Sequence, residues 1–273
     1  MVGRGVQDVL PPLALAFWRW LFAFVILLPF ALRPMLRERA AIARHWRMLI
    51  VLGVLGVGSF NTLLYIGLGT TTATNALLLN SSIPVLIAAI GWMFFGERIT
   101  PRQACGIAIS LAGVVAIVAK GDAGHLLGLQ VNPGDLWAFA AMVSWALYTL
   151  LLRRRPGLTA MAFLGITVLI GLLANLPFYL AEIASGAHVR VAPGSASAVA
   201  YMAIFPSVLA YMFWNRAVAE VGAARSGLFG HLMPVFGSVL AYLFLGEQLH
   251  VYHFAGFALI LCGIVLATSG RRA

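Results

Sequence analysis

The sequence predicts an all-α, polytopic membrane helix bundle made of two repeats with inverted topology. Three observations support this fold class. Of the 273 residues, 62% are hydrophobic and 10% are charged, whereas an ordinary globular domain has about 45–50% apolar and about 25% charged residues. Apolar runs long enough to cross a bilayer recur along the chain. A set of turn and helix residues also recurs at one fixed spacing of 150 positions.

About nine apolar runs are long enough, at roughly 20 residues each, to cross a bilayer as helices. They are continuously apolar and do not alternate, which favours helices over the strands of a barrel. The connections between them are short, so we expect no separate soluble domain. The runs cover residues 13–32, 47–68, 73–95, 102–119, 134–152, 159–180, 197–215, 223–245 and 251–268.

The basic residues sort to one side if these runs cross the membrane alternately. Arg4, Lys120 and Arg190 fall on one side, and Arg19 lies inside the first run. Because basic loops stay in the cytoplasm, we expect the opposite, arginine-rich side and the C-terminus to be cytoplasmic. This asymmetry explains the net charge of +10 without a nucleic-acid partner. The arginine-rich side receives Arg33, Arg37, Arg39, Arg44, Arg47, Arg98, Arg102, Arg153, Arg154, Arg155, Arg216, Arg225, Arg271 and Arg272.

An internal repeat divides the chain. Five crossings separate the two copies, so they insert in opposite orientations, as the halves of many secondary transporters do. We expect a first repeat at residues 1–121 with four spans and a second at 122–273 with five. The first repeat has no counterpart of residues 134–152. We therefore expect the intact protein to have ten spans, five in each repeat. The landmarks Pro84, Gly96, Glu97, Gly106 and Gly113 recur as Pro234, Gly246, Glu247, Gly256 and Gly263.

Three motifs mark the first copy: NALLLNSSIP at 75–84, FGERIT at 95–100, and the pair Gly106 and Gly113. Together with the second copy, they resemble the EamA-type module of the drug/metabolite transporter superfamily. The resemblance covers nearly the whole chain. The first helix of the family's module has no counterpart in it. It implies a ten-helix exporter with a central cavity that moves amino acids, related metabolites or drugs. In the shorter small multidrug resistance relatives the first helix carries a coupling glutamate, so the coupling chemistry stays open.

Two prolines near the middle of their spans, Pro84 and Pro234, are candidate hinges. Proline removes a backbone donor, and the carbonyls released at membrane depth need protein or water as partners. Polar residues flank both prolines, and these are candidate substrate-binding residues: Asn80, Ser81, Ser82 and His231. Alternatively, these residues only shape helix packing. His231 could bind a carboxylate, couple proton movement, or be a neutral core residue.

Two further groups of residues are candidate substrate contacts. Aromatic and amide side chains share helix faces and suit a flat or hydrophobic ligand with hydrogen-bonding groups: Asn61, Tyr65, Trp145, Tyr148, Tyr211, Trp214 and Asn215. Ordinary interhelical packing is the alternative. Arg19 is a candidate charge site, because intramembrane cations are commonly functional. Its side chain could instead reach the outer interface beside Trp18 and Trp20.

No acidic residue falls in the middle of a span, where a proton-relay carboxylate is expected. The eight are Asp8, Glu38, Glu97, Asp122, Asp135, Glu182, Glu220 and Glu247. Transport would therefore be facilitated diffusion or exchange, unless the missing helix holds the coupling group. A His-Glu-x-x-His zinc motif is also missing from the sequence, so we expect no enzyme, metal or cofactor.

These patterns predict a secondary transporter that exports a small organic solute by alternating access. A sugar-phosphate or nucleotide-sugar carrier is an alternative, although it would need several cavity cations, and a membrane scaffold without transport is another. The expected partners are the bilayer and a small molecule, with no nucleic acid, and a monomer is one possibility. Seventeen arginines against one lysine, with abundant alanine, favour a bacterial cytoplasmic membrane.

Overall fold

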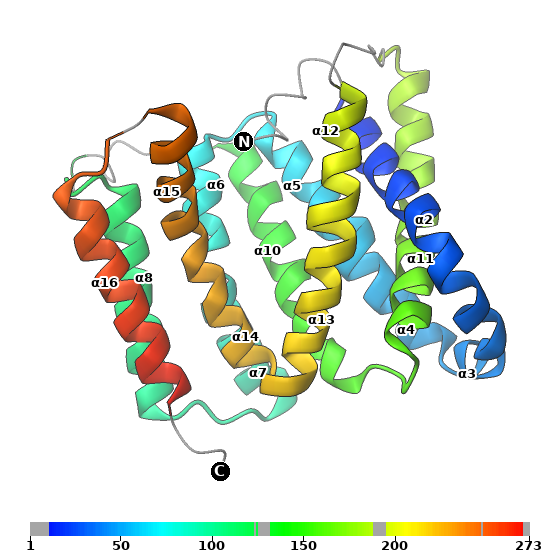
Figure 1. Cartoon of the computed structure of the whole chain (residues 1–273), viewed down its shortest axis with the longest axis horizontal. Helices are drawn as coiled ribbons and strands as arrows, with labels where there is room; N and C mark the ends of the chain where they lie inside the picture. The colour runs from blue at the N-terminus through cyan, green and yellow to red at the C-terminus, as the bar shows by residue number, and fades with distance from the viewer. Residues whose placement is uncertain (1–10, 123, 125–131, 188–194, 247, 270–273) are drawn as a thin grey trace.

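The computed structural model describes residues 11–122, 124, 132–187, 195–246 and 248–269. Every regular element in these ranges is helical, which confirms the polytopic helical fold class (Figure 1). Arg4, Asp8, Arg190, Glu247, Arg271 and Arg272 lie outside the described residues. Eight helical stretches are long and apolar enough to cross a membrane: Pro12–Arg37, Trp46–Leu68, Thr74–Phe95, Pro101–Val118, Pro133–Arg154, Ala160–Ala184, Ala223–Phe244 and Val251–Thr268.

The remaining expected span, residues 197–215, is continuous but irregular. It consists of α12 (Ser195–Met202), the π-helix η3 (Ala203–Leu209) and α13 (Ala210–Val221). The second span has the same construction, with α4 (Trp46–Leu52), the π-helix η1 (Gly53–Ser59) and α5 (Phe60–Leu68). The two π-helices have seven residues each and begin 150 positions apart. A π-helix interrupts the regular hydrogen-bond ladder and is frequent at functional sites.

Two other spans are broken in the middle of the bundle. The first consists of α6 (Ala73–Asn80) and α7 (Ile83–Phe95), and the second of α14 (Ala223–Leu228), the 3-10 helix η4 (Phe229–Leu232) and α15 (Met233–Leu245). Pro84 and Pro234 occupy the first turn of α7 and α15, where proline costs no helical hydrogen bond. The prolines therefore start new helices at a break rather than kink a continuous helix.

The helices α2 (Pro12–Arg37) and α11 (Ala160–Ala184) pack side by side at one edge of the bundle (Figure 1). The first turn of α2 has no acidic residue of its own and no side-chain cap. Instead the Glu182 carboxylate accepts hydrogen bonds from the backbone N–H groups of Leu13 at 3.1 Å and Ala14 at 2.7 Å. These donors have no acceptor within their own helix, so α11 completes the start of α2.

At the other edge, α8 (Pro101–Val118) and α16 (Val251–Thr268) pack as an antiparallel pair. A Cβ on Gly106 would lie 2.6 Å from the carbonyl oxygen of Gly263, and one on Gly113 would lie 2.7 Å from that of Gly256. Real Cβ atoms do not approach so closely, so only glycine allows this separation of the two helices. These glycines therefore form a small-residue contact between the two helices.

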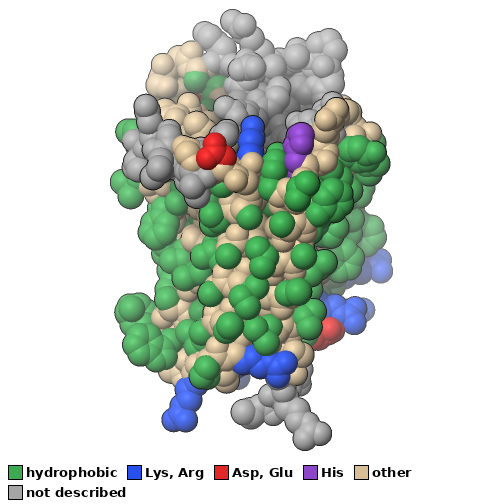
Figure 2. Space-filling model, turned by 90° about the vertical axis from the view of Figure 1, so that its left-hand side faces the viewer, with side chains coloured by type: hydrophobic (Ala, Val, Ile, Leu, Met, Phe, Trp, Pro, Cys, Tyr) green, Lys and Arg blue, Asp and Glu red, His purple; other side chains and the backbone are tan. Residues whose placement is uncertain are grey.

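The middle of the bundle holds α10 (Pro133–Leu151), which ends in the short 3-10 turn η2 (Leu152–Arg154). It packs against α5, α6 and α7. The face seen in Figure 2 is a band of hydrophobic side chains with Lys, Arg, Asp, Glu and His near its two ends. Such a band is what a lipid-embedded surface requires. The short helix α3 (Arg39–Arg44) and the ends of α2, α7 and α16 share one end of the bundle, here called the arginine-rich end.

Candidate functional site

A guanidinium lies buried between α2, α5 and η3. The Arg19 residue is only 5% exposed, so its side chain does not extend to the outer interface. Its Nε donates to Ser207 Oγ at 2.6 Å, and its Nη2 donates to the Pro206 carbonyl oxygen at 3.1 Å. Its Nη1 donates to Asn61 Oδ1 at 2.8 Å and to Tyr65 OH at 2.7 Å. Every one of these acceptors is neutral.

The same network continues across the bundle through Tyr211. Asn61 Nδ2 donates to the hydroxyl oxygen of Tyr211 at 3.1 Å, and that hydroxyl donates to the carbonyl oxygen of Gly56 at 2.5 Å. Gly56 and Pro206 hold equivalent places in the two π-helices, fourth in each. In both π-helices this carbonyl accepts a bond from a side chain of another helix. The irregular turns therefore supply backbone acceptors to the centre of the bundle.

An aromatic group packs beside this network. The Trp145 ring lies with its centroid 5.3 Å from those of Tyr148, Tyr211 and Trp214, and 4.6 Å from that of Phe60. These distances are typical of favourable aromatic contacts. Trp145, Tyr148 and Tyr211 are each less than 10% exposed. The rings pack on one another, so the centre is closed in this conformation.

Hydrogen bonds fix the polar ends of this aromatic group. Tyr148 OH donates to Asn215 Oδ1 at 2.7 Å, and Trp214 Nε1 donates to Thr149 Oγ1 at 3.2 Å. Together with the Arg19 network, these contacts bring eight of the expected residues into one buried cluster, here called the central cluster. Its expected members are Arg19, Asn61, Tyr65, Trp145, Tyr148, Tyr211, Trp214 and Asn215.

Two of the other expected residues, Ser81 and His231, form a second cluster at the breaks between helices. His231 is fully buried. Its Nε2 lies 2.9 Å from the Ser81 carbonyl oxygen and its Nδ1 lies 2.7 Å from Ser110 Oγ. A carbonyl can only accept, so Nε2 carries a proton and donates a hydrogen bond to the Ser81 oxygen. His231 thus ties both broken spans to α8, and the trio His231, Ser81 and Ser110 is here called the histidine bridge.

The remaining polar candidates, Asn80 and Ser82, form hydrogen bonds to neither cluster's side chains among the described residues. Asn80 Nδ2 lies 3.0 Å from the sulfur of Met233, and Ser82 Oγ donates to the Leu79 carbonyl oxygen at 2.6 Å. Both Asn80 and Ser82 are partly exposed. The sequence prediction missed Ser110, Gly56 and Pro206, which contribute a hydroxyl and two carbonyls. No motif signals the two carbonyls, because only the π-helical geometry makes them available.

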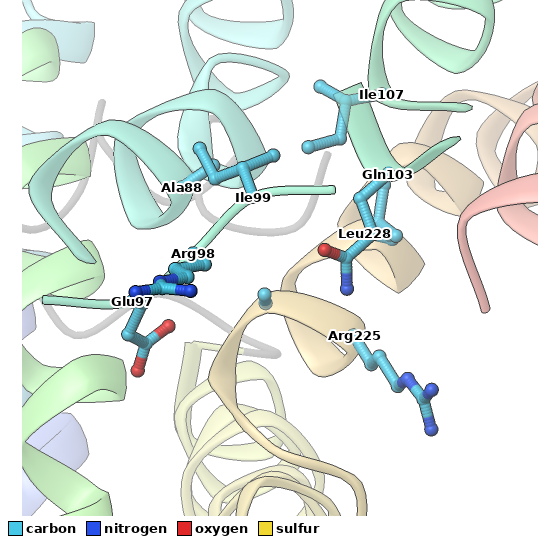
Figure 3. A pocket seen from close by; sticks show the side chains of 9 residues that line it. Ala88, Glu97, Arg98, Ile99, Gln103, Ile107, Arg225 and Leu228 are labelled. Carbon is cyan, nitrogen blue, oxygen red and sulfur yellow. The ribbon is translucent and has the colours of Figure 1, made fainter. Parts of the chain in front are cut away.

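Two clefts open toward opposite ends of the bundle. A narrow cleft of about 100 Å³ lies near the arginine-rich end, between α7, the start of α8 and α14 (Figure 3). A wider cleft of about 440 Å³ lies toward the other end, between α6, the end of α8, α15 and the start of α16. The wide cleft is lined by Met233, Pro234, Lys120, His250 and His253, among others.

The lining residues of the two clefts correspond at the 150-residue spacing. Ala88, Arg98, Gln103 and Ala224 line the narrow cleft, and Ser238, Gln248, His253 and Thr74 hold the matching places in the wide cleft. A third cavity, of about 470 Å³, lies at the ends of α10 and α13 near the arginine-rich end. Among the described residues no group of His, Cys, Asp or Glu has the arrangement of a metal site.

Comparison with known proteins gives a consistent picture. The chain is 29% identical to the uncharacterized transporter YyaM of Bacillus subtilis over 94% of this chain and 84% of that protein. It is 30% identical to the uncharacterized transporter YetK of the same species over 100% of this chain and 83% of that protein. A Streptantibioticus cattleyicolor protein named "Probable terminal-alkyne amino-acid exporter" is 30% identical over 84% of this chain and 76% of its own length.

A solved crystal structure superposes with a TM-score of 0.78 at 21% identity, covering 97% of this chain and 90% of that one. At this identity the likeness shows the fold alone. The sequence profile of the EamA-like transporter family matches residues 1–119 and 132–269. These two matches take in most of the chain, and the chain therefore belongs to the EamA-like transporter family.

Proposed function

We propose that this protein exports a small organic solute across a bacterial cytoplasmic membrane by alternating access. The family match and a relative named as an amino-acid exporter support export of an amino acid or a related metabolite. Two units of opposite orientation, at residues 1–121 and 122–273, would let the protein alternate between a conformation open to the cytoplasm and one open to the outer side. The arginine-rich end would face the cytoplasm, because cytoplasmic loops carry the excess of basic residues.

The pair of corresponding clefts carries this proposal. In a carrier made of inverted repeats, the two repeats exchange conformations during transport. Equivalent clefts on opposite sides of the membrane therefore open in turn. Four lining residues of the narrow cleft have their counterparts in the wide cleft, but the two volumes are about 100 Å³ and about 440 Å³. Ala88 in the narrow cleft is 8% exposed, whereas its counterpart Ser238 is more accessible. This inequality is what a carrier open toward its outer side would have.

The histidine bridge would be the barrier between the two mouths. Along α8, Ile107 lines the narrow cleft and Ile117 the wide one, with Ser110 between them. The same order holds along α14 to α15, where His231 lies between Leu228 and Met233. The helix breaks at this level, with Pro84 and Pro234 as hinges, would let each half-helix tilt while its partner stays in place.

The central cluster would supply the surface that the solute contacts when the two units separate. Ile83 and Ile87 of α7 belong to the same buried apolar core as Trp145 and Tyr148. A tilt of α7 at the helix break would therefore shift the packing around the aromatic rings. Amphipathic rings with fixed polar ends suit a solute with both an apolar part and hydrogen-bonding groups. A neutral or zwitterionic solute fits such a surface better than a sugar phosphate.

Cysteine accessibility tests the proposal directly. In a variant in which Cys105 and Cys262 are replaced by alanine, Ala88→Cys and Ser238→Cys are introduced separately. Without solute, an impermeant maleimide should label Ser238→Cys from the outer side and leave Ala88→Cys unreacted. Saturating L-phenylalanine, the first probe of a panel of the common amino acids, should raise labelling of Ala88→Cys and lower that of Ser238→Cys. If the two rates never change in opposite directions across the panel, alternating access is wrong.

A further inference from the structure

A positive charge is buried in this bundle without a negative partner. Arginine keeps its charge in proteins, and the Arg19 residue is 5% exposed. None of the hydrogen bonds and ion pairs among the described residues joins it to a carboxylate. The buried charge at this depth is expensive, and neutral acceptors compensate it only in part.

The described carboxylates are engaged elsewhere or lie at the ends of helices. Glu97 pairs with Arg153, Asp135 accepts from Thr71, and Glu182 accepts from the start of α2. Glu220 pairs with Arg216 on the surface of α13. Among the described residues Arg19 therefore lies beside the aromatic group without a counter-charge, which a ligand would supply.

A neutral donor without an acceptor among the described residues lies beside Arg19. The Trp20 side chain is fully buried, and its indole N–H has no hydrogen-bond partner among the described residues. The Arg19 guanidinium carbon lies 5.1 Å from the centroid of this indole ring, and the ring contacts Tyr211 with a centroid distance of 5.2 Å. A buried indole N–H normally finds an acceptor. Of these two adjacent groups, the guanidinium thus lacks a counter-charge and the indole N–H lacks an acceptor among the described residues.

The partners of Arg19 are divided between helices that would move apart. Asn61 and Tyr65 belong to α5, whereas Pro206 and Ser207 belong to η3. Separation of these two segments would remove one pair of acceptors and break the bond between Asn61 and Tyr211. The guanidinium would then present free N–H groups toward the aromatic rings, in the planar arrangement that fits a carboxylate.

We infer that Arg19 binds the carboxylate of the transported solute, with the Trp20 indole N–H as an additional donor. This inference rests on the proposed function and narrows the solute to organic acids and zwitterions with a free carboxylate. A single guanidinium balances one negative charge. The solute would therefore bind through one monoanionic group, which takes the place of the acceptors on η3 or on α5 after that segment has moved away. Its apolar part would pack on Trp145 and Tyr211.

Counterflow into liposomes that contain the purified full-length chain tests the inference. The probes are L-phenylalanine and L-leucine, each compared with its amide, which has the same side chain but no carboxylate. The wild type should move at least one acid about tenfold or more faster than its amide, because a site built around a charged contact rejects the analogue that lacks it. Arg19→Gln should lose this preference, with the acid falling to the rate of the amide.

Two further variants separate recognition from stability. Arg216→Gln removes an exposed arginine and should keep the preference for the acid. Arg19→Lys keeps the charge without the planar fork, and it should raise KM for the acid about tenfold at similar kcat. This variant also decides the matter if Arg19→Gln is not recovered as folded protein. A wild type without preference for the acid, a preference retained in Arg19→Gln, or an unchanged KM in Arg19→Lys would overturn the inference.

Failure of the proposed function would look different. In that case the wild type would give no counterflow of any probe, and the labelling rates at positions 88 and 238 would not respond to solute. That result would overturn both proposals. Reciprocal labelling together with equal rates for acid and amide would overturn only the role of Arg19.

Discussion

The amide of Asn61 donates a 3.1 Å hydrogen bond to the hydroxyl oxygen of Tyr211, a residue 150 positions later in the chain. The same separation joins the His231 ring to the Ser81 carbonyl oxygen at 2.9 Å. If the two repeats are related by an axis, residues that contact their own counterparts must lie on it. The central cluster and the histidine bridge each contain one such pair, so both would lie where relative movement of the units is transmitted.

Removal of the Tyr211 hydroxyl should weaken the central cluster while the aromatic ring stays in place. Tyr211→Phe leaves the Gly56 carbonyl and the Asn61 amide without this partner in a buried place, which costs about 1–3 kcal/mol per unsatisfied group. We expect a melting temperature several degrees below that of the wild type and reduced flux of the transported solute. Tyr201→Phe is the control, because Tyr201 is 49% exposed. Equal melting temperatures for Tyr211→Phe and the wild type would refute a stabilising role.

The glycine contact between α8 and α16 should tolerate no side chain. In Gly263→Leu the new Cβ would lie 2.5 Å from the Gly106 carbonyl oxygen and 2.5 Å from the Ser110 amide nitrogen. The helices must separate, so we expect a clear loss of melting temperature and of monodisperse protein in detergent. Gly237→Ala provides a control of opposite sign, since no atom lies within 4 Å of its added Cβ and alanine favours a helix by roughly 1 kcal/mol over glycine. Similar behaviour of the two variants would show that the close contact is unimportant.

The histidine bridge should control transport more than insertion. His231→Ala removes the side chain that joins Ser81 and Ser110, and the two broken spans lose their connection to α8. We expect solute counterflow to fall about tenfold or more, as for a lost positioning contact, while the protein still reaches the membrane. Ser110→Ala removes only one of the two bonds and should fall in between. Wild-type flux from His231→Ala would exclude the bridge from the transport cycle.

Orientation in the membrane can be read from two exposed positions. Ala40 lies in α3 at the arginine-rich end, and Ser185 follows the end of α11. With Cys105 and Cys262 replaced by alanine, intact cells should allow an impermeant maleimide to label Ser185→Cys but not Ala40→Cys. Lysis of the cells should expose both. The reverse pattern would place the arginine-rich end outside and contradict the basic-loop rule.

Sequence reasoning predicted the fold class because lipid imposes long apolar helices, and it found the glycines of α8 and α16 because they recur at the 150-residue spacing. It did not predict the π-helices, although residues 53–59 hold three glycines and residues 203–209 hold Pro206, because glycine and proline are frequent in membrane helices in general. The prolines were expected as hinges near the middle of their spans, but Ser81 and Ser82 form a turn that ends α6, so Pro84 begins a separate helix. Local sequence alone does not distinguish these two outcomes.

The position of Arg19 shows the same limit for the site. The sequence left two destinations open, the outer interface and the bundle interior. The deciding acceptor, Ser207, lies 188 positions away, and no local pattern contains that information. Sequence reasoning separated the residues beside the two prolines from the aromatic and amide faces, and the structure keeps this division. It adds Arg19 to the central cluster and Ser110 to the histidine bridge, and it leaves Asn80 and Ser82 outside both. Pairings between helices, and not the composition of any helix, set these placements.

The cap that Glu182 provides for α2 has a consequence for biogenesis. Spans enter the bilayer in the order in which the ribosome makes them, and the carboxylate that accepts from Leu13 and Ala14 arrives only with the far end of α11. Until then the first turn of α2 has open amides that must be satisfied by water or headgroups at the membrane surface. Completion of this early helix therefore waits for a much later one, and nascent chains that stop before residue 182 should leave α2 susceptible to proteolysis at its start.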